Sequence, residues 1–96
     1  MTIDEFQKQI EGSYFKRDSA RGVAGTFMWF TEEVGELASA VRGGSEDELR
    51  EEFADVFAWL VSLASLAGVR MEDAVAKYAG GCPVCRETPC ACPEKP

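Results

Sequence analysis

Four carboxylates in two short motifs are the residues of this chain that most clearly could do chemistry. Glu33 and Glu36 stand three residues apart in "EEVGEL", and Glu52 and Asp55 repeat that spacing in "EEFADV". On a helix, this spacing places both side chains of a pair on one face. Carboxylate oxygens are hard ligands that suit Mg²⁺ or Mn²⁺. If the two helices pack together, the motifs predict one divalent-metal site.

The acidic residues cluster strongly, and the cluster has two readings. Residues 31–56 hold nine of the 17 acids and account for the net charge of −7. Like charges at this density destabilise a fold unless cations offset them. The alternative is a solvated helix face, which is the usual role of charge runs. A di-iron carboxylate site in its usual form is excluded, because the chain has no histidine. The acids at 46–48 fit the solvated reading, since they begin a helix where the dipole favours negative charge.

The elements that must position these acids are all expected to be helices, because apolar residues recur at helical spacing and nothing reads as a strand. Capping boxes at Thr2 and Ser45 mark two helix starts. The fold class is therefore all-α, a four-helix bundle (residues 1–79) followed by a short irregular cysteine-rich tail (residues 80–96). The expected helices are residues 3 to about 17, 22–42, 46–67 and 71–79, with a turn at "SARG", residues 19–22.

The two motifs are expected to meet in an antiparallel hairpin. The turn "GGS" at residues 43–45 is short, so the flanking helices must pack side by side. Glu36 and Glu52 each lie about eight residues from it, which is about 12 Å along a helix. Residues 56–66 are apolar nearly all round, which predicts burial on more than one side and hence a homodimer or homotetramer.

The bulk composition narrows the function. The length suits one small domain, and the acidic balance argues against a nucleic-acid partner. The most apolar stretch is shorter than a bilayer requires, so no membrane partner is expected. The N-terminus lacks the pattern of a signal peptide, and the expected location is cytoplasmic.

With these residues in view, the chain resembles the MazG-type nucleoside triphosphate pyrophosphohydrolases, the all-α NTP pyrophosphatase superfamily. "EEVGEL" followed by "EEFADV" looks like the family's ExxE…ExxD signature, and the likeness extends over residues 14–79. It implies a MazG-like bundle that cleaves nucleoside triphosphates between the α- and β-phosphates. Glu33, Glu36, Glu52 and Asp55 would bind Mg²⁺. Glu32 or Glu33 would orient or deprotonate the attacking water.

Aromatic and basic residues near the motifs are candidate substrate contacts. Trp59 follows Asp55 by one turn and Trp29 precedes Glu33 by one turn, so either ring could stack on a nucleobase; a core role is the alternative. Three cations near the end of the first helix could reach the β- and γ-phosphates, or could be solvated surface charges. These cations are Lys16, Arg17 and Arg21.

All four cysteines lie in the tail "CPVCRETPCAC", spaced C-x2-C-x4-C-x-C. Two close thiol pairs suit a tetrahedral structural zinc site, and metal binding could order a segment too short to bury a core. The alternatives are two disulfides or a redox-active tail. Most members of the resembling family lack such a tail. The predicted zinc ligands are Cys82, Cys85, Cys90 and Cys92.

Three other functions compete with the expected activity. Phosphoribosyl-ATP pyrophosphohydrolase is a sibling activity within the resembling superfamily. A non-catalytic helical oligomer with a partner-binding zinc tail is the alternative from another class. A nucleic-acid module in the tail is disfavoured by the net charge.

Overall fold

The computed structural model describes residues 1–94, and within them every regular element is helical. The prediction of an all-α fold is confirmed, but there are three α-helices where four were expected. Helix α1 runs over Ile3–Gly43, α2 over Glu46–Leu66 and α3 over Met71–Val75. A short 3₁₀ helix, η1 (Ala76–Tyr78), follows α3 and completes the segment predicted as a fourth helix.

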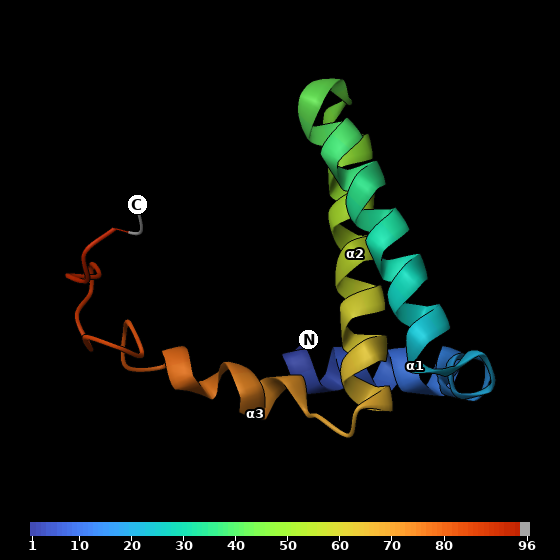
Figure 1. Ribbon diagram of the computed structural model, residues 1–96, viewed down its shortest axis with the longest axis horizontal. Coiled ribbons are helices and arrows are strands. Elements are labelled where there is room, and N and C mark those ends of the chain that lie inside the picture. Colours follow the sequence, from blue (N-terminus) through green and yellow to red (C-terminus); the bar gives the residue numbers. More distant parts are fainter. Residues whose placement is uncertain (95–96) are drawn as a thin grey trace.

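The first two predicted helices form one element that is broken at Gly22. The predicted turn at residues 19–22 is wrong, because helix continues through residue 21. Gly22 alone leaves helical geometry, with φ 89° and ψ 168°. That conformation is essentially restricted to glycine, so one residue redirects the chain. The first arm of α1 (residues 3–21) therefore crosses the base of the hairpin in Figure 1, while the second arm (residues 23–43) runs up alongside α2.

The second arm of α1 and α2 form the expected antiparallel hairpin (Figure 1). Ser45 caps α2 through its side-chain oxygen, which accepts a hydrogen bond from the Glu48 N–H. Gly44 is required at the turn because a Cβ there would lie 2.9 Å from the backbone of Ala40. Ala40 and Val61 are the buried apolar residues within the described part of the chain.

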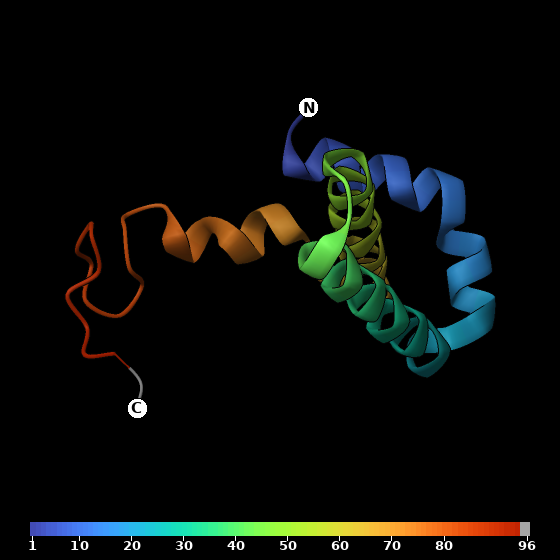
Figure 2. The same cartoon turned by 90° about the horizontal axis from the view of Figure 1, so that it is seen from above.

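A buried polar contact fixes where α3 leaves the hairpin. The Gln7 side chain is fully buried and donates to Ser65 Oγ and to the Val69 carbonyl, both at 2.9 Å. Its oxygen accepts from the Met71 N–H at 2.8 Å. These bonds tie the start of α3 to the first arm of α1. From that anchor, α3 and the tail extend away from the hairpin, as both Figure 1 and Figure 2 show.

Large apolar side chains remain exposed along the hairpin. Phe53 is 58% exposed on α2, and Val41 is 62% exposed on α1. Among the described residues, no single helix has the length and apolarity to cross a membrane; α2 together with Met71–Tyr78 meets that test only as a pair bent by 104°. A single copy of the chain therefore leaves much of the hairpin's apolar surface in water.

Candidate metal and substrate site

Three of the four predicted metal ligands converge between α2 and the second arm of α1. Carboxylate oxygens of Glu33, Glu36 and Glu52 lie within 4.8 Å of one another. Oε2 of Glu33 and Oε2 of Glu52 are buried and have no hydrogen-bond partner. A buried carboxylate oxygen without a donor is costly, and a cation is the partner that would satisfy both.

The electrostatics of the cluster agree with that geometry. Burial raises the pKa of Glu33, and the charges of Glu36, Asp55 and Glu52 raise it further. Burial also raises the pKa of Glu52, with Glu36 and Asp55 as the next causes. Each shift reports a carboxylate that is poorly accommodated as an anion when no cation is nearby. Asp55 lies outside the closest group of three, but its charge also raises the pKa of both glutamates.

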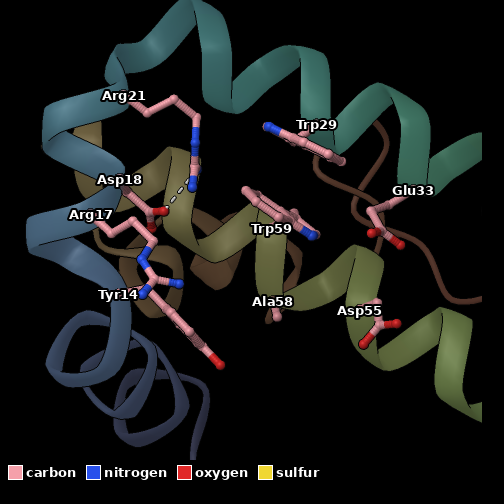
Figure 3. Close-up of a pocket in the computed structure, with 9 residues that line it drawn as sticks. All are labelled: Tyr14, Arg17, Asp18, Arg21, Trp29, Glu33, Asp55, Ala58 and Trp59. Atoms are coloured by element: carbon pink, nitrogen blue, oxygen red, sulfur yellow. Dashed lines mark hydrogen bonds and ion pairs between the residues drawn. The ribbon is translucent and has the colours of Figure 1, made fainter.

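A cavity of about 390 Å³ opens beside the carboxylates. Its walls come from the first arm of α1, the second arm of α1 and α2, so the break at Gly22 is what closes it. Figure 3 shows arginines at one end, the two tryptophans in the middle, and Glu33 with Asp55 at the other end. The lining residues are Tyr14, Arg17, Asp18, Arg21, Trp29, Glu33, Asp55, Ala58 and Trp59.

The two tryptophans face each other within this cavity. The rings of Trp29 and Trp59 have centroids 6.2 Å apart and planes 13° from parallel. Trp29 is 47% exposed, so it is not a core residue of the single chain. The Arg21 guanidinium lies over the Trp59 ring, 5.2 Å from its centroid. Flat, accessible aromatic faces of this kind can stack on a nucleobase.

Some of the basic and acidic residues predicted from sequence line the cavity, and others lie outside it. Arg17 and Arg21 line the cavity, whereas Lys16 is exposed and does not. Glu33 lines both the cavity and the metal cluster, whereas Glu32 is exposed and lies outside both.

Three cavity residues were missed by the sequence analysis, namely Tyr14, Asp18 and Ala58, and Asp18 is the charged one. Asp18 is only 4% exposed, and its Oδ1 accepts from Arg21 Nη1 at 3.0 Å. Arg21 Nη1 also lies 3.4 Å from Thr26 Oγ1, across the break at Gly22. The signal was present, because an acid three residues before an arginine can pair with it on a helix. Assigning residues 19–22 to a turn concealed that spacing.

The four cysteines of the tail form a second cluster that could hold a metal. Their sulfur atoms lie within 4.8 Å of one another. The Sγ atoms of Cys82 and Cys92 are 3.8 Å apart, and those of Cys85 and Cys90 are 3.9 Å apart. All four are free thiols. Each of these two pairs therefore brings a cysteine from the first half of the loop close to one from the second half.

Neighbouring groups shift the pKa values of two of these thiols in opposite directions. Donors at Ala91 and then Glu87 lower the pKa of Cys85 to about 6. The Cys90 thiol and then its other cysteine neighbours raise the pKa of Cys92 to about 11. Cysteine binds metal as the thiolate. A cation in the cluster would offset the repulsion between neighbouring thiolates.

Comparison with known families identifies the part of the chain that contains the hairpin. The family model of the MazG nucleotide pyrophosphohydrolase domain matches residues 22–83. Since the match covers well over half of the chain, this protein belongs to the MazG family, and the resemblance inferred from the two motifs is confirmed. No curated protein matches the chain. The family match begins at the glycine that breaks α1 and ends within the cysteine tail.

Proposed function

We propose that this protein is a Mg²⁺-dependent nucleoside triphosphate pyrophosphohydrolase. It would cleave (deoxy)nucleoside triphosphates between the α- and β-phosphates, giving the monophosphate and pyrophosphate, with noncanonical or surplus nucleotides as candidate substrates. One observation carries the proposal: in a MazG-family hairpin, three carboxylates with two unpartnered buried oxygens border a cavity containing two facing tryptophans.

The residues present fit a hard divalent cation. Glu33, Glu36 and Glu52 offer oxygens from both arms of the hairpin, and Asp55 lies within the same field. Mg²⁺ (or Mn²⁺) held there would neutralise phosphate charge and acidify a bound water. Between the two candidate bases, the geometry favours Glu33 over the exposed Glu32 for orienting that water. The phosphates would bind at this end of the cavity.

The remaining cavity residues would bind the nucleoside. A base stacked on Trp29 or Trp59 would place the triphosphate toward Glu33. In Figure 3, Arg17 and Arg21 lie on one side of the tryptophans and the carboxylates lie on the other. We therefore assign these arginines to the base and sugar end, in place of the phosphate contacts expected from sequence. Lys16, outside the cavity, is assigned no substrate contact.

The proposal includes an oligomer and a second metal. Exposed Val34, Phe53 and Phe57 on the hairpin would be covered in a homodimer or a homotetramer, because this much apolar surface is uncommon on a monomer. The thiols of the tail would hold a structural zinc ion, since soft thiolates select zinc over magnesium. No nucleic acid or membrane takes part, and the expected site of action is the cytoplasm.

The decisive experiment measures pyrophosphate release and metal dependence on one preparation. The full chain is incubated with Mg²⁺ and a panel of canonical and modified nucleoside triphosphates together with phosphoribosyl-ATP, each tested separately. Glu52→Gln should strongly lower the rate of release, whereas Glu51→Gln, which removes the same charge from the neighbouring exposed position, should not. If no nucleotide yields pyrophosphate in the presence of Mg²⁺ or Mn²⁺, the proposed function is wrong.

Two other functions remain distinguishable by the same assay. Release of pyrophosphate from phosphoribosyl-ATP alone would identify the sibling activity. A non-catalytic helical oligomer would release none, and Mg²⁺ would not raise its melting temperature. The unpartnered oxygens of Glu33 and Glu52 favour an enzyme, since a purely structural hairpin gains nothing from burying them.

A further inference from the structure

We propose that the four cysteines form one closed zinc site, and that this ion folds residues 81–92 as a unit separate from the catalytic hairpin. The inference extends the zinc assignment of the proposed function to the folding of the loop, and it does not depend on the pyrophosphohydrolase activity. It concerns which sulfurs share the ion, what the site is for, and which part of the chain depends on it.

Two of the sulfur–sulfur distances match those of a tetrahedral zinc site, and all four sulfurs lie within 4.8 Å of one another. With Zn–S bonds of about 2.3 Å, two sulfurs on a tetrahedral zinc ion stand about 3.8 Å apart. The Cys82–Cys92 and Cys85–Cys90 sulfur pairs are 3.8 and 3.9 Å apart. The spacing is therefore already that of ligands around one ion, whereas a disulfide requires about 2.05 Å between sulfurs.

Backbone N–H groups surround the sulfurs as a thiolate site requires. The N–H of Val84 donates to Cys82 Sγ at 3.4 Å, and that of Ala91 donates to Cys85 Sγ at 3.3 Å. The N–H of Cys92 donates to Cys90 Sγ at 3.3 Å. Such donors orient ligands and spread the charge of bound thiolates.

Four protein ligands leave no open position, so the site is structural. A catalytic zinc site keeps one position for water or substrate, whereas four thiolates fill the tetrahedron. None of residues 81–92 is buried, so the segment has no hydrophobic core of its own. Metal binding then supplies the free energy that a hydrophobic core supplies elsewhere.

The loop backbone is shaped for this site. The Arg86 N–H donates to the Cys82 carbonyl at 2.7 Å, and the Cys82 N–H donates to the Glu87 carbonyl at 3.2 Å. Gly81 has φ 101°, and a Cβ there would lie 2.7 Å from Thr88 Oγ1 and 3.1 Å from the Glu87 carbonyl oxygen. Only glycine fits a positive φ with so close an approach. Gly80 has no such constraint and provides a matched control.

The unit is separate from the hairpin. Within residues 1–94, the hydrogen bonds of residues 82–92 stay inside that segment, and Gly81 donates to Tyr78 in the adjoining η1. Figures 1 and 2 show the loop standing away from α2 at the end of α3 and η1. Loss of its ion should therefore disorder the loop without unfolding the hairpin.

Cobalt provides the test, because Co²⁺ bound tetrahedrally by thiolates has visible bands that octahedral carboxylate sites lack. The reduced, metal-stripped full chain is titrated with Co²⁺ without oxygen. We expect one equivalent to saturate the bands and one equivalent of Zn²⁺ to bleach them. Cys90→Ser and Cys85→Ser should each weaken Co²⁺ binding by at least about 100-fold, more than the loss of an outer-shell partner. Glu33→Gln should leave the titration unchanged.

Two further readouts decide the folding claim. On stripping the metal, amide hydrogen exchange should rise throughout residues 81–92 and stay slow in residues 50–64 of α2. Gly81→Ala should weaken Co²⁺ binding, while Gly80→Ala should not. The proposal is overturned if the reduced chain shows no thiolate bands, if the bands survive both serine substitutions, or if exchange rises equally in α2. A freshly purified chain with two disulfides that takes up no cobalt after reduction would also overturn it.

Discussion

The hairpin and the tail both gather ionisable ligands, but helix packing assembles one cluster and the ligands themselves assemble the other. In the hairpin, two helices hold Glu33 and Glu52 in place whether or not a cation is present, and their buried oxygens make the metal-free state less stable. In the tail, the loop has no buried residue, and the cysteine cluster with a few backbone hydrogen bonds holds it. A preformed site that costs stability suits catalysis, whereas a site that creates its own fold suits structure.

The largest expected effect separates the two clusters by activity. Glu52→Gln should lower kcat/KM for pyrophosphate release by at least about 100-fold, because a lost metal ligand exceeds the effect of a lost outer-shell partner. The tail should still bind one zinc ion per chain, measured by elemental analysis. A variant that lost its zinc together with its activity would show that the two regions are coupled.

Two glycines of α1 test how the hairpin region is shaped. Gly22→Ala should destabilise the protein by about 1–3 kcal/mol, because its backbone conformation is nearly closed to other residues. Chemical denaturation measures the change. Gly12→Ala, inside the first arm with open space around its Cβ, should instead stabilise by up to about 1 kcal/mol. Equal effects at both positions would contradict the assigned break in α1.

Removing one ligand should have opposite effects on folding in the two regions. Without divalent ions, Glu33→Gln should raise the melting temperature, because it removes a buried charge worth about 1 kcal/mol, or several degrees in a domain of this size. With saturating Mg²⁺ the order should reverse. Cys85→Ser should leave the hairpin transition in place and loosen only the loop. A fall in melting temperature for metal-free Glu33→Gln would mean that the carboxylate is not strained.

The smallest expected effect concerns the contact that holds the start of α3 to the first arm of α1. Arg70 at the start of α3 donates to Asp4 and to Glu11 on the first arm. Hydrogen bonds from Arg70 and then Lys8 lower the pKa of Asp4 below its ordinary 3.8. A lowered pKa stabilises the fold above the unfolded value, and that contribution is lost as pH falls through the folded value. The stability advantage of the natural chain over Asp4→Asn should therefore shrink below about pH 4.

Urea midpoints measured at neutral and acidic pH provide the test of the Asp4 contact. If Asp4→Asn differed from the natural chain by the same amount at every pH, the ion pair would carry no pH-dependent stability. Hydrogen exchange in α3 should follow the same trend, because this contact holds that helix to the first arm.

Much of the hairpin could be predicted from the sequence. The pairing of Glu33 with Glu36 and of Glu52 with Asp55 followed from helical spacing, and the short turn at residues 43–45 implied that the pairs would meet. The break at Gly22 was misplaced, because "SARG" reads locally as a turn while the surrounding residues sustain a helix. Asp18 was missed for the same reason.

The sequence by itself determined the all-α class, the caps at Thr2 and Ser45, the MazG signature and the types of ligand at each cluster, because these depend on residues within a few positions of one another. Only the tertiary structure decided that Asp18 and Arg21 share a cavity with Glu33, that Lys16 and Glu32 lie outside it, and that all four cysteine sulfurs gather in one cluster. Those facts depend on the single backbone angle at Gly22 and on how the chain folds back on itself. Neither is encoded in any local spacing.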